Sequence, residues 1–451
     1  MKKSRLMSLI MVLLCGSLAF SQTDQTPRPF QAGIVLGTDV YNTGPGNTPE
    51  SWTQLGFQPD VAIGKVGVGL NLTLHFQVYP VNYPDQAVIF YPGDWVPSSQ
   101  GFGDWASLYL SKILYLRYGL KGTDPLFVKV GSISDFTLGN GFIMGNYSNM
   151  SFFPQTRFAG LDFGIDGSMF NFPWVGFEFL TNNLARFDVI GTHVLVRPLV
   201  GTDLPILKNL QAGLTLAADT NPGLFASTTS PSTSYSGPAS VAVYGLDVAL
   251  PLLDSPAASA TAFSEAALEP NSRAGFMLGA GGKLISIFTW GAQLRLLGAG
   301  FIPTYFDTNY DLYRDAKAEL MQTNPSGNAF VGWFGSLGTS ILGDKLSASV
   351  SLDGPFAAGV VNDIYSWPHL RALAHFGEGI LPGIYADASY EKYALGATYG
   401  FLRDLVDATD AIAGLSINYR TGSSILTLLY NAKWLDQSWK VTSSLQATLK
   451  F

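Results

Sequence analysis

The last thirteen residues of the chain alternate between two kinds of side chain and end on an aromatic residue. From Trp439 to Phe451 one face carries apolar or small side chains, and the other carries Lys, Thr, Ser and Gln. A period of two is typical of a β-strand whose faces meet different surroundings. Such a strand fits a barrel wall with lipid outside and water inside. It also fits a half-buried edge strand of a soluble sheet, so the rest of the chain must decide between the two.

The first 21 residues have the pattern of a secretory signal peptide. Basic residues open the chain, an apolar run follows from Leu6 to Phe20, and small residues stand at the spacing that a signal peptidase reads. We expect residues 1–21 to be removed and residues 22–451 to form one exported domain. Cleavage would also remove Cys15, the single cysteine, so no disulfide, thiolate nucleophile or cysteine metal site is expected.

Composition favours a membrane protein without spanning helices. Hydrophobic residues make up 47% of the chain and charged residues 13%, about half the usual charged fraction of a soluble protein. After the signal, no apolar run reaches the length of about 18 residues that a transmembrane helix needs. We therefore predict an all-β fold, a transmembrane antiparallel up-and-down β-barrel, because closure pairs every backbone group. A large soluble β-sandwich or β-helix is the alternative.

Internal segments repeat the alternation of the terminal strand. In Val66–Val78, apolar residues occupy one face and Gly, Asn, Thr, His and Gln the other. Weaker copies lead to a prediction of about 14–18 strands with a central value of 16, an even number as in bacterial barrels. The pattern fails around Gly354 to Leu381, where a strand is either missed or added. A short helix is predicted from Asp311 to Met321.

The connections between these strands fall into two classes. Some are tight turns rich in Gly and Asp, and others are long and polar, as expected for a barrel with short turns at one end and long loops at the other. The short turns are 122–125, 343–345 and 420–423, and the long connections are 79–104, 221–237 and 307–327.

One segment, Leu126 to Met150, is expected to fold into the barrel. Its strand runs into Thr-Leu-Gly-Asn-Gly, and its glycines permit close approach of the backbone to other groups. We predict a constricting loop with polar side chains facing the lumen. A turn followed by a surface loop is the alternative. The residues predicted to face the lumen are Asp135, Asn140, Asn146 and Asn149.

Strand parity places charged side chains on the inner wall. Opposed basic and acidic groups narrow a pore and set a transverse field, whereas scattered charges would simply solvate a wet lumen. The candidate pore-lining residues are Arg117, Lys121, Lys129, Asp135, Asp162, Glu178 and Arg295.

Sequence motifs for catalysis are missing. The histidines are four, and neither H-E-x-x-H nor G-x-S-x-G nor a phosphate-binding G-x-x-x-x-G-K-[ST] occurs. Residues 1–21 carry three positive charges and no acidic residue, so their loss changes the formal net charge from -7 to -10. An acidic chain lacks the basic surface of a nucleic-acid-binding protein. We therefore expect no enzyme, cofactor, metal or nucleic-acid partner.

The signal, the alternating strands and the aromatic C-terminus together resemble the outer-membrane β-barrel proteins of Gram-negative bacteria, and the chain is porin-like in this respect. The resemblance implies the bacterial cell outer membrane as location. Its implied partners are lipid, the barrel-assembly machinery, small solutes and other copies of the chain in a homo-oligomer. The terminal strand would be the assembly signal through Trp439, Val441, Leu445, Leu449 and Phe451.

Three functions are compatible with this pattern. A channel for passive diffusion of small hydrophilic solutes is favoured by the Gly, Ser, Thr, Asn and Gln of the predicted lumen. A transporter of hydrophobic molecules, similar to the fatty-acid transporter family, would need an apolar pocket near Phe136, Phe142, Phe152 and Phe153. The Asn-Pro-Ala of that family's plug is absent from this sequence. A surface adhesin or antigen would act through long loops such as Asn221 to Gly237.

Overall fold

The computed structural model describes residues 30–451, apart from 45–47, 79–87, 98, 154–155, 227–233, 326, 358–364, 366–367, 398, 408 and 436. The predicted signal peptide, residues 1–21, lies outside the described residues. So does the middle of the long connection 221–237. No helix in the described ranges is long and apolar enough to cross a membrane.

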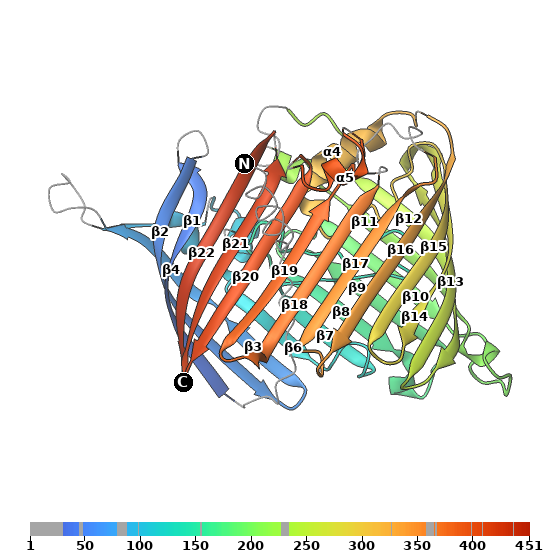
Figure 1. Ribbon diagram of the computed structural model, residues 1–451, viewed down its shortest axis with the longest axis horizontal. Helices are drawn as coiled ribbons and strands as arrows, with labels where there is room; N and C mark the ends of the chain where they lie inside the picture. Colours follow the sequence, from blue (N-terminus) through green and yellow to red (C-terminus); the bar gives the residue numbers. More distant parts are fainter. Residues whose placement is uncertain are drawn as a thin grey trace, which may run out of the picture.

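The described chain is mainly β-structure, with a few short helices between strands (Figure 1). The helices are η1 (Pro92–Asp94), α2 (Phe102–Leu110), η2 (Gly167–Phe170), η3 (Leu207–Asn209), η4 (Pro222–Phe225), η5 (Pro270–Ser272), α4 (Tyr310–Gln322) and α5 (Phe401–Asp404). The strands are β1 (Phe30–Gly44), β2 (Thr48–Ile63), β3 (Val66–Leu70), β4 (Leu72–Val78), β5 (Val88–Phe90), β6 (Ile113–Tyr118), β7 (Leu126–Gly131), β8 (Gly160–Asp166), β9 (Val175–Thr181), β10 (Val189–Val196), β11 (Gln211–Asp219), β12 (Val241–Asp254), β13 (Ala258–Glu269), β14 (Arg273–Leu284), β15 (Phe288–Leu297), β16 (Phe330–Ile341), β17 (Leu346–Pro355), β18 (His369–Leu381), β19 (Ile384–Lys392), β20 (Ala411–Thr421), β21 (Ser424–Leu435) and β22 (Ser438–Lys450).

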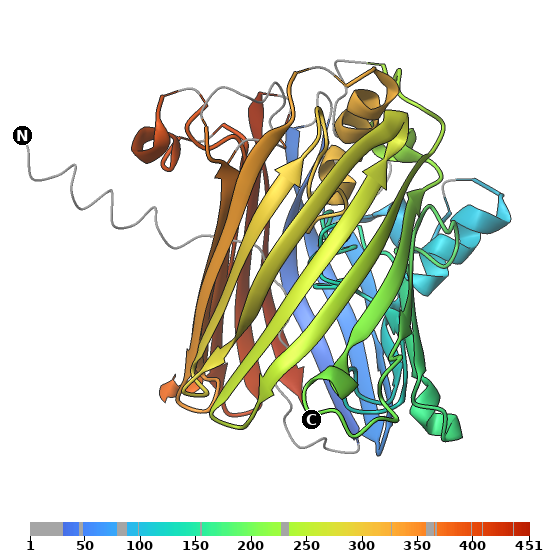
Figure 2. The same ribbon diagram turned by 90° about the vertical axis from the view of Figure 1, so that its right-hand side faces the viewer.

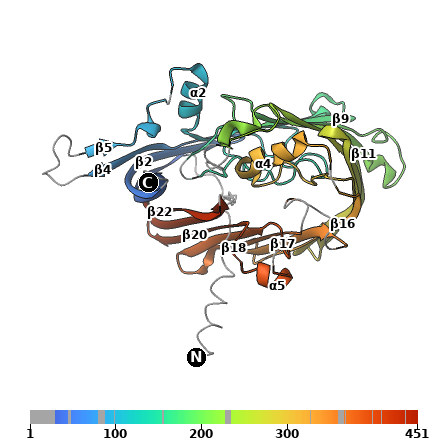
Figure 3. The same cartoon turned by 90° about the horizontal axis from the view of Figure 1, so that it is seen from above.

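These strands form one closed antiparallel barrel. Each strand of the ring pairs with its neighbours in the chain, and β22 returns to pair with β1 from Gly33↔Lys450 to Val40↔Ser443. Twenty of the 22 strands form the ring, and β4 and β5 extend outside it. Figure 3 shows the ring from above, with β4 and β5 projecting from one side. The predicted fold class is confirmed.

The central prediction of 16 strands is too low. The contrast that reveals a strand is weak in β13 and β14, because Ala and Gly stand on both of their faces, as in Ala-Ser-Ala-Thr-Ala and Gly-Ala-Gly-Gly. β18 begins at His369, inside the region where the pattern fails. The predicted strand Val66–Val78 is divided at Asn71 into β3 and β4. β3 continues the ring to β6, whereas β4 pairs with β5.

The two surfaces of the barrel wall have opposite character. On β22 the Leu445 side chain points outward and is 49% exposed, whereas Ser444 points inward and is 1% exposed. Large apolar residues such as Leu246 and Leu337 project outward along other strands, and polar residues such as Asp247 are buried inside. An apolar exterior and a polar interior are the pattern of a membrane-spanning barrel, and the terminal strand has the orientation that its sequence predicts.

The two ends of the barrel also differ. The tight turns 122–125, 343–345 and 420–423 each follow an even-numbered strand, so all three lie at the end where the C-terminus lies (Figure 1). The opposite end carries the long connections and the helices α4 and α5. The helix predicted from Asp311 to Met321 is confirmed as α4.

Two of the long connections fold inside the ring. We call residues 132–159, between β7 and β8, the first inner segment, and residues 298–329, between β15 and β16, the second inner segment. Figure 2 shows α4 of the second inner segment within the upper part of the barrel. The first inner segment confirms the prediction that residues following β7 enter the lumen.

Candidate functional site

A dry aromatic cluster joins the two inner segments. In the first, Phe136 and Tyr147 pair as antiparallel strands, with N–H···O distances of 2.9 and 2.8 Å. The Phe142 ring stacks on Phe301 of the second segment at a centroid distance of 5.2 Å. These four side chains are all almost fully buried. They form the core of a folded body inside the barrel.

Asn149 fastens the first inner segment to the barrel wall. Its side-chain oxygen accepts from Ile133 N at 2.8 Å, and its Nδ2 donates to the carbonyl oxygens of Asn182 at 2.9 Å, Phe158 at 3.3 Å and Gly131 at 3.3 Å. The side chain is buried. The sequence predicts Asn149 to face the lumen, but its amide is occupied by these backbone groups.

Replacing Asn149 by alanine is expected to loosen the first inner segment. The buried N–H of Ile133 loses its partner, and an unsatisfied buried backbone group costs about 1–3 kcal/mol. Hydrogen–deuterium exchange should therefore quicken across residues 132–149 while β20–β22 stay protected. Asn146→Gly is the matched control, because Asn146 is exposed and glycine accepts its φ of 52. Equal exchange in both variants would contradict this role for Asn149.

The tip of the same segment rests against the inner wall. Glu265 of β13 accepts from Asn140 N at 3.1 Å and from Phe142 N at 3.4 Å. Gly139 has φ 54, and a Cβ there would lie 3.2 Å from an Asp247 oxygen. A glycine is needed at this point, because it allows both the left-handed backbone and the close approach to the wall.

The helix α4 is held by a buried ionic network around Arg314. Its Nε and Nη2 donate to Asp219 at 2.9 and 2.6 Å, and its Nη1 donates to Asp188 at 2.9 Å. Arg314 is 1% exposed. Burial raises the pKa of Asp311, one turn earlier, to about 7, although Arg314 opposes this shift. Tyr147 donates to Asp311 at 3.2 Å, so the network also links the two inner segments.

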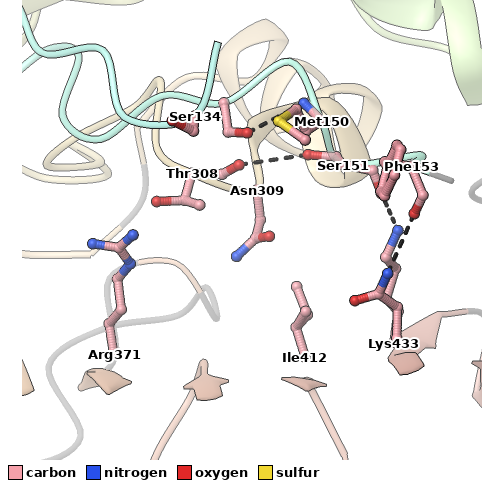
Figure 4. A pocket seen from close by; sticks show the side chains of 11 residues that line it. Ser134, Met150, Ser151, Phe153, Thr308, Asn309, Arg371, Ile412 and Lys433 are labelled. Carbon is pink, nitrogen blue, oxygen red and sulfur yellow. Dashed lines mark hydrogen bonds between the residues drawn. The ribbon is translucent and has the colours of Figure 1, made fainter. Parts of the chain in front are cut away.

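A polar gap remains between the inner segments and the opposite wall, formed by β18–β21 (Figure 4). Its space is about 590 Å³, including the part open to solvent. Lys433 donates to Ser151 O and Asn431 donates to Phe153 O at 3.4 Å, so two contacts bridge the gap. The lining consists of Ser134, Ser148, Met150, Ser151, Phe153, Thr308, Asn309, Arg371, Ile412, Asn431 and Lys433.

A carboxylate next to the gap fixes one side of it. Glu391 of β19 accepts from Arg371 Nε at 2.7 Å and also from the Asn309 amide, and His369 Nε2 lies 3.6 Å from it. Arg371 and Asn309 thereby take fixed positions on opposite sides of the gap. The negative charge of Glu391 is engaged by groups of this cluster.

The predicted pore-lining residues lie elsewhere on the inner wall. Lys121 donates to Asp162 at 2.9 Å, and Arg117 and Lys129 are register partners on β6 and β7. Glu178 lies 3.5 Å from His193. None of the seven candidates belongs to the described lining of the gap.

The two remaining candidates are apart from this group. Arg295 is buried and pairs with Asp353 at 2.5 Å. Asp135 is exposed and accepts from Ser134 at 3.3 Å. The charges at the gap, Arg371 and Lys433, were missed by the sequence analysis. Lys433 could have been found from the alternation of residues 424–435. It falls on the same face as the polar residues Thr427 and Asn431.

Two histidines pair with carboxylates. His75 of β4, outside the ring, lies between Asp39 at 2.8 Å and Asp94 at 2.9 Å, and His193 of β10 lies 3.0 Å from Asp247. Across the described ranges, no set of three or more His, Cys, Asp or Glu side chains has an arrangement that would hold a metal ion.

Comparisons with known proteins give low similarity throughout. No family model matches the sequence, and no curated protein matches it. The solved structure of Pseudomonas aeruginosa OpdL covers 94% of this chain and 98% of its own, at 8% identity and a TM-score of 0.33. The outer membrane protein opdK from Pseudomonas aeruginosa covers 94% and 98%, at 9% identity and 0.33. A mutant of Rh. blastica porin covers 94% and 99%, at 9% identity and 0.27.

These scores assign no family, and the class of the protein follows from its own structure. A closed ring of antiparallel strands leaves no unpaired edge, and its exterior is apolar while its interior is polar and charged. An exterior that is apolar over most of the wall is favourable only when the hydrocarbon core of a membrane surrounds it. The fold and the site therefore define a membrane-spanning β-barrel whose lumen is narrowed by two inner segments.

Proposed function

We propose that this protein is a porin-like channel of the bacterial outer membrane through which small hydrophilic solutes diffuse passively. The observation that carries the proposal is the polar gap between the first inner segment and the wall formed by β18–β21. The inner segments reduce the wide lumen of a barrel with twenty strands to a smaller passage. The core of the inner segments is filled by buried apolar side chains. Water and solutes would therefore pass through the polar gap beside them.

The lining of the gap suits a hydrated solute. Ser134, Ser148, Ser151 and Thr308 bring hydroxyl groups to it. Hydroxyl groups both donate and accept hydrogen bonds, and they can replace part of the hydration of a passing solute. Diffusion requires no bond to be made or broken, so the proposed activity involves no catalysis.

The alternatives require features of other kinds. A transporter of hydrophobic molecules needs an accessible apolar pocket, whereas Phe136 and Phe142 are buried and Phe142 stacks on Phe301. An adhesin or antigen would act through the long loops at the end that carries α4 and α5. The proposed membrane partners are lipid around the wall, the assembly machinery at the C-terminal strand, and a second copy of the chain in an oligomer.

Single-channel recording tests this proposal. The chain without residues 1–21 is refolded and inserted into a planar lipid bilayer. The channel predicts discrete current steps that grow with salt concentration. An inserted barrel that stays silent but binds a labelled fatty acid saturably would instead favour the transporter of hydrophobic molecules.

A further inference from the structure

A row of charged residues crosses the wall beside the polar gap. On the inner face, Arg371 of β18 pairs in register with Glu391, Glu391 with Ile412, and Ile412 with Lys433. The row ends at Lys440 of β22, which lies directly across from Lys433. It therefore contains three cations and one carboxylate.

The two lysines of this row have the same charge at directly opposed positions. Like charges opposite each other on neighbouring strands destabilise a sheet. Trp439 is on the outer face, so the alternation of β22 places Lys440 on the inner face with Lys433. Ammonium groups at these two positions repel each other.

Neither lysine has a carboxylate partner among the described residues. The ammonium of Lys433 donates to the neutral carbonyl oxygen of Ser151, and within the described part of the chain no ion pair within 4.0 Å involves Lys433 or Lys440. Two other inward cations are neutralised locally, Lys121 by Asp162 at 2.9 Å and Arg295 by Asp353 at 2.5 Å. Counted over the described residues, positive charge is therefore left over at the gap.

The one carboxylate of the row does not offset this excess. Glu391 accepts from Arg371 at 2.7 Å and from the Asn309 amide. The negative charge of Glu391 therefore balances Arg371 next to it, whereas Lys433 and Lys440 lie two and three strands away along the row.

We propose that Lys433 and Lys440 form a selectivity site for small anions at the constriction of the channel. The inference rests on the proposed channel and adds the charge of its preferred solutes. The proposed preference for anions is opposite to what the formal net charge of the chain, -7, would suggest. The charges at the narrow part of a pore, rather than its net charge, determine which ions pass. The neighbouring Asn431 amide has two N–H groups, one of which donates to Phe153 O. The other is a neutral donor, which suits oxyanions such as carboxylates.

The test is the reversal potential of the refolded channel in a KCl gradient, repeated with acetate in place of chloride. The wild type is expected to pass the anion in preference to the cation. A Lys433→Gln/Lys440→Gln variant should lose this preference. A unit charge that a solute approaches to about 4 Å in water changes its relative permeability about fivefold, which corresponds to about 1 kcal/mol. Lys433→Glu/Lys440→Glu should reverse the preference.

The matched control is Lys208→Gln, which removes an exposed lysine from η3 at the opposite end of the barrel. It should leave the reversal potential unchanged. The heat-dependent shift in gel migration of a folded barrel shows whether each variant has folded, and Lys433→Arg/Lys440→Arg keeps both charges if the glutamine variant fails to fold. The arginine variant should retain the anion preference.

The outcomes separate the two proposals. A conducting channel that prefers cations, or one whose preference ignores both lysines, would overturn the selectivity site and leave the channel intact. An inserted barrel without any conductance would overturn the channel, and with it the selectivity site.

Discussion

Replacing Arg314 by methionine is expected to detach α4 from the barrel wall. Arg314 is 1% exposed and binds Asp219 and Asp188 at 2.6–2.9 Å. Its loss would leave buried carboxylates without a cation, which costs about 3–5 kcal/mol. Methionine keeps much of the apolar volume of the side chain, so the effect reports chiefly on the lost charge.

This loss should appear first in the second inner segment. Hydrogen–deuterium exchange should accelerate across α4, and the current through single channels should become noisier as the inner segments move. Arg403→Met is the matched control, because Arg403 is exposed on α5. An α4 that stays as protected in the Arg314 variant as in the control would show that the aromatic cluster alone holds the helix.

Shortening the first inner segment is expected to raise the single-channel conductance severalfold. Asn149 N donates to Ile133 O at 3.0 Å, so the two ends of the hairpin lie side by side. Residues 135–147 can therefore be replaced by a short Gly-Ser linker with both ends kept in place. The change removes Phe136 and Phe142 from the lumen and opens the space that the segment fills.

The control for this deletion is a loop outside the pore. Figure 3 shows α5 on the outer side of the ring, so replacing residues 400–407 by the same linker should leave the conductance unchanged. If the deletion of residues 135–147 has no more effect than this control, the first inner segment does not form the constriction.

The sequence predicted the elements that have one apolar and one polar face, because one face contacts lipid and the other water. β22 and the strand around Val66–Val78 show apolar and polar faces, and α4 shows a helical pattern with a polar beginning. This contrast is weak in β13 and β14, where Ala and Gly occur on both faces. The strand count was too low because a strand is recognised by the difference in polarity between its two faces. Ala and Gly differ little in polarity, so strands rich in them show little alternation.

The site was predicted less well than the fold. Strand parity predicts that Lys121, Asp162 and Arg295 face the lumen, but it gives no information about which charges neutralise each other. Lys433 and its acceptor Ser151 are 282 positions apart in the sequence. Their contact depends on how the first inner segment crosses the lumen, and that path is set by long-range packing around Phe142, Phe301 and α4.

The central claim of this account is that the barrel holds an open, water-filled passage. The most direct test is the current through single molecules of the refolded chain, without residues 1–21, in a planar lipid bilayer at several salt concentrations. The account predicts discrete current steps that increase with salt. A barrel shown to be folded and inserted that carries no current at any salt concentration would contradict it.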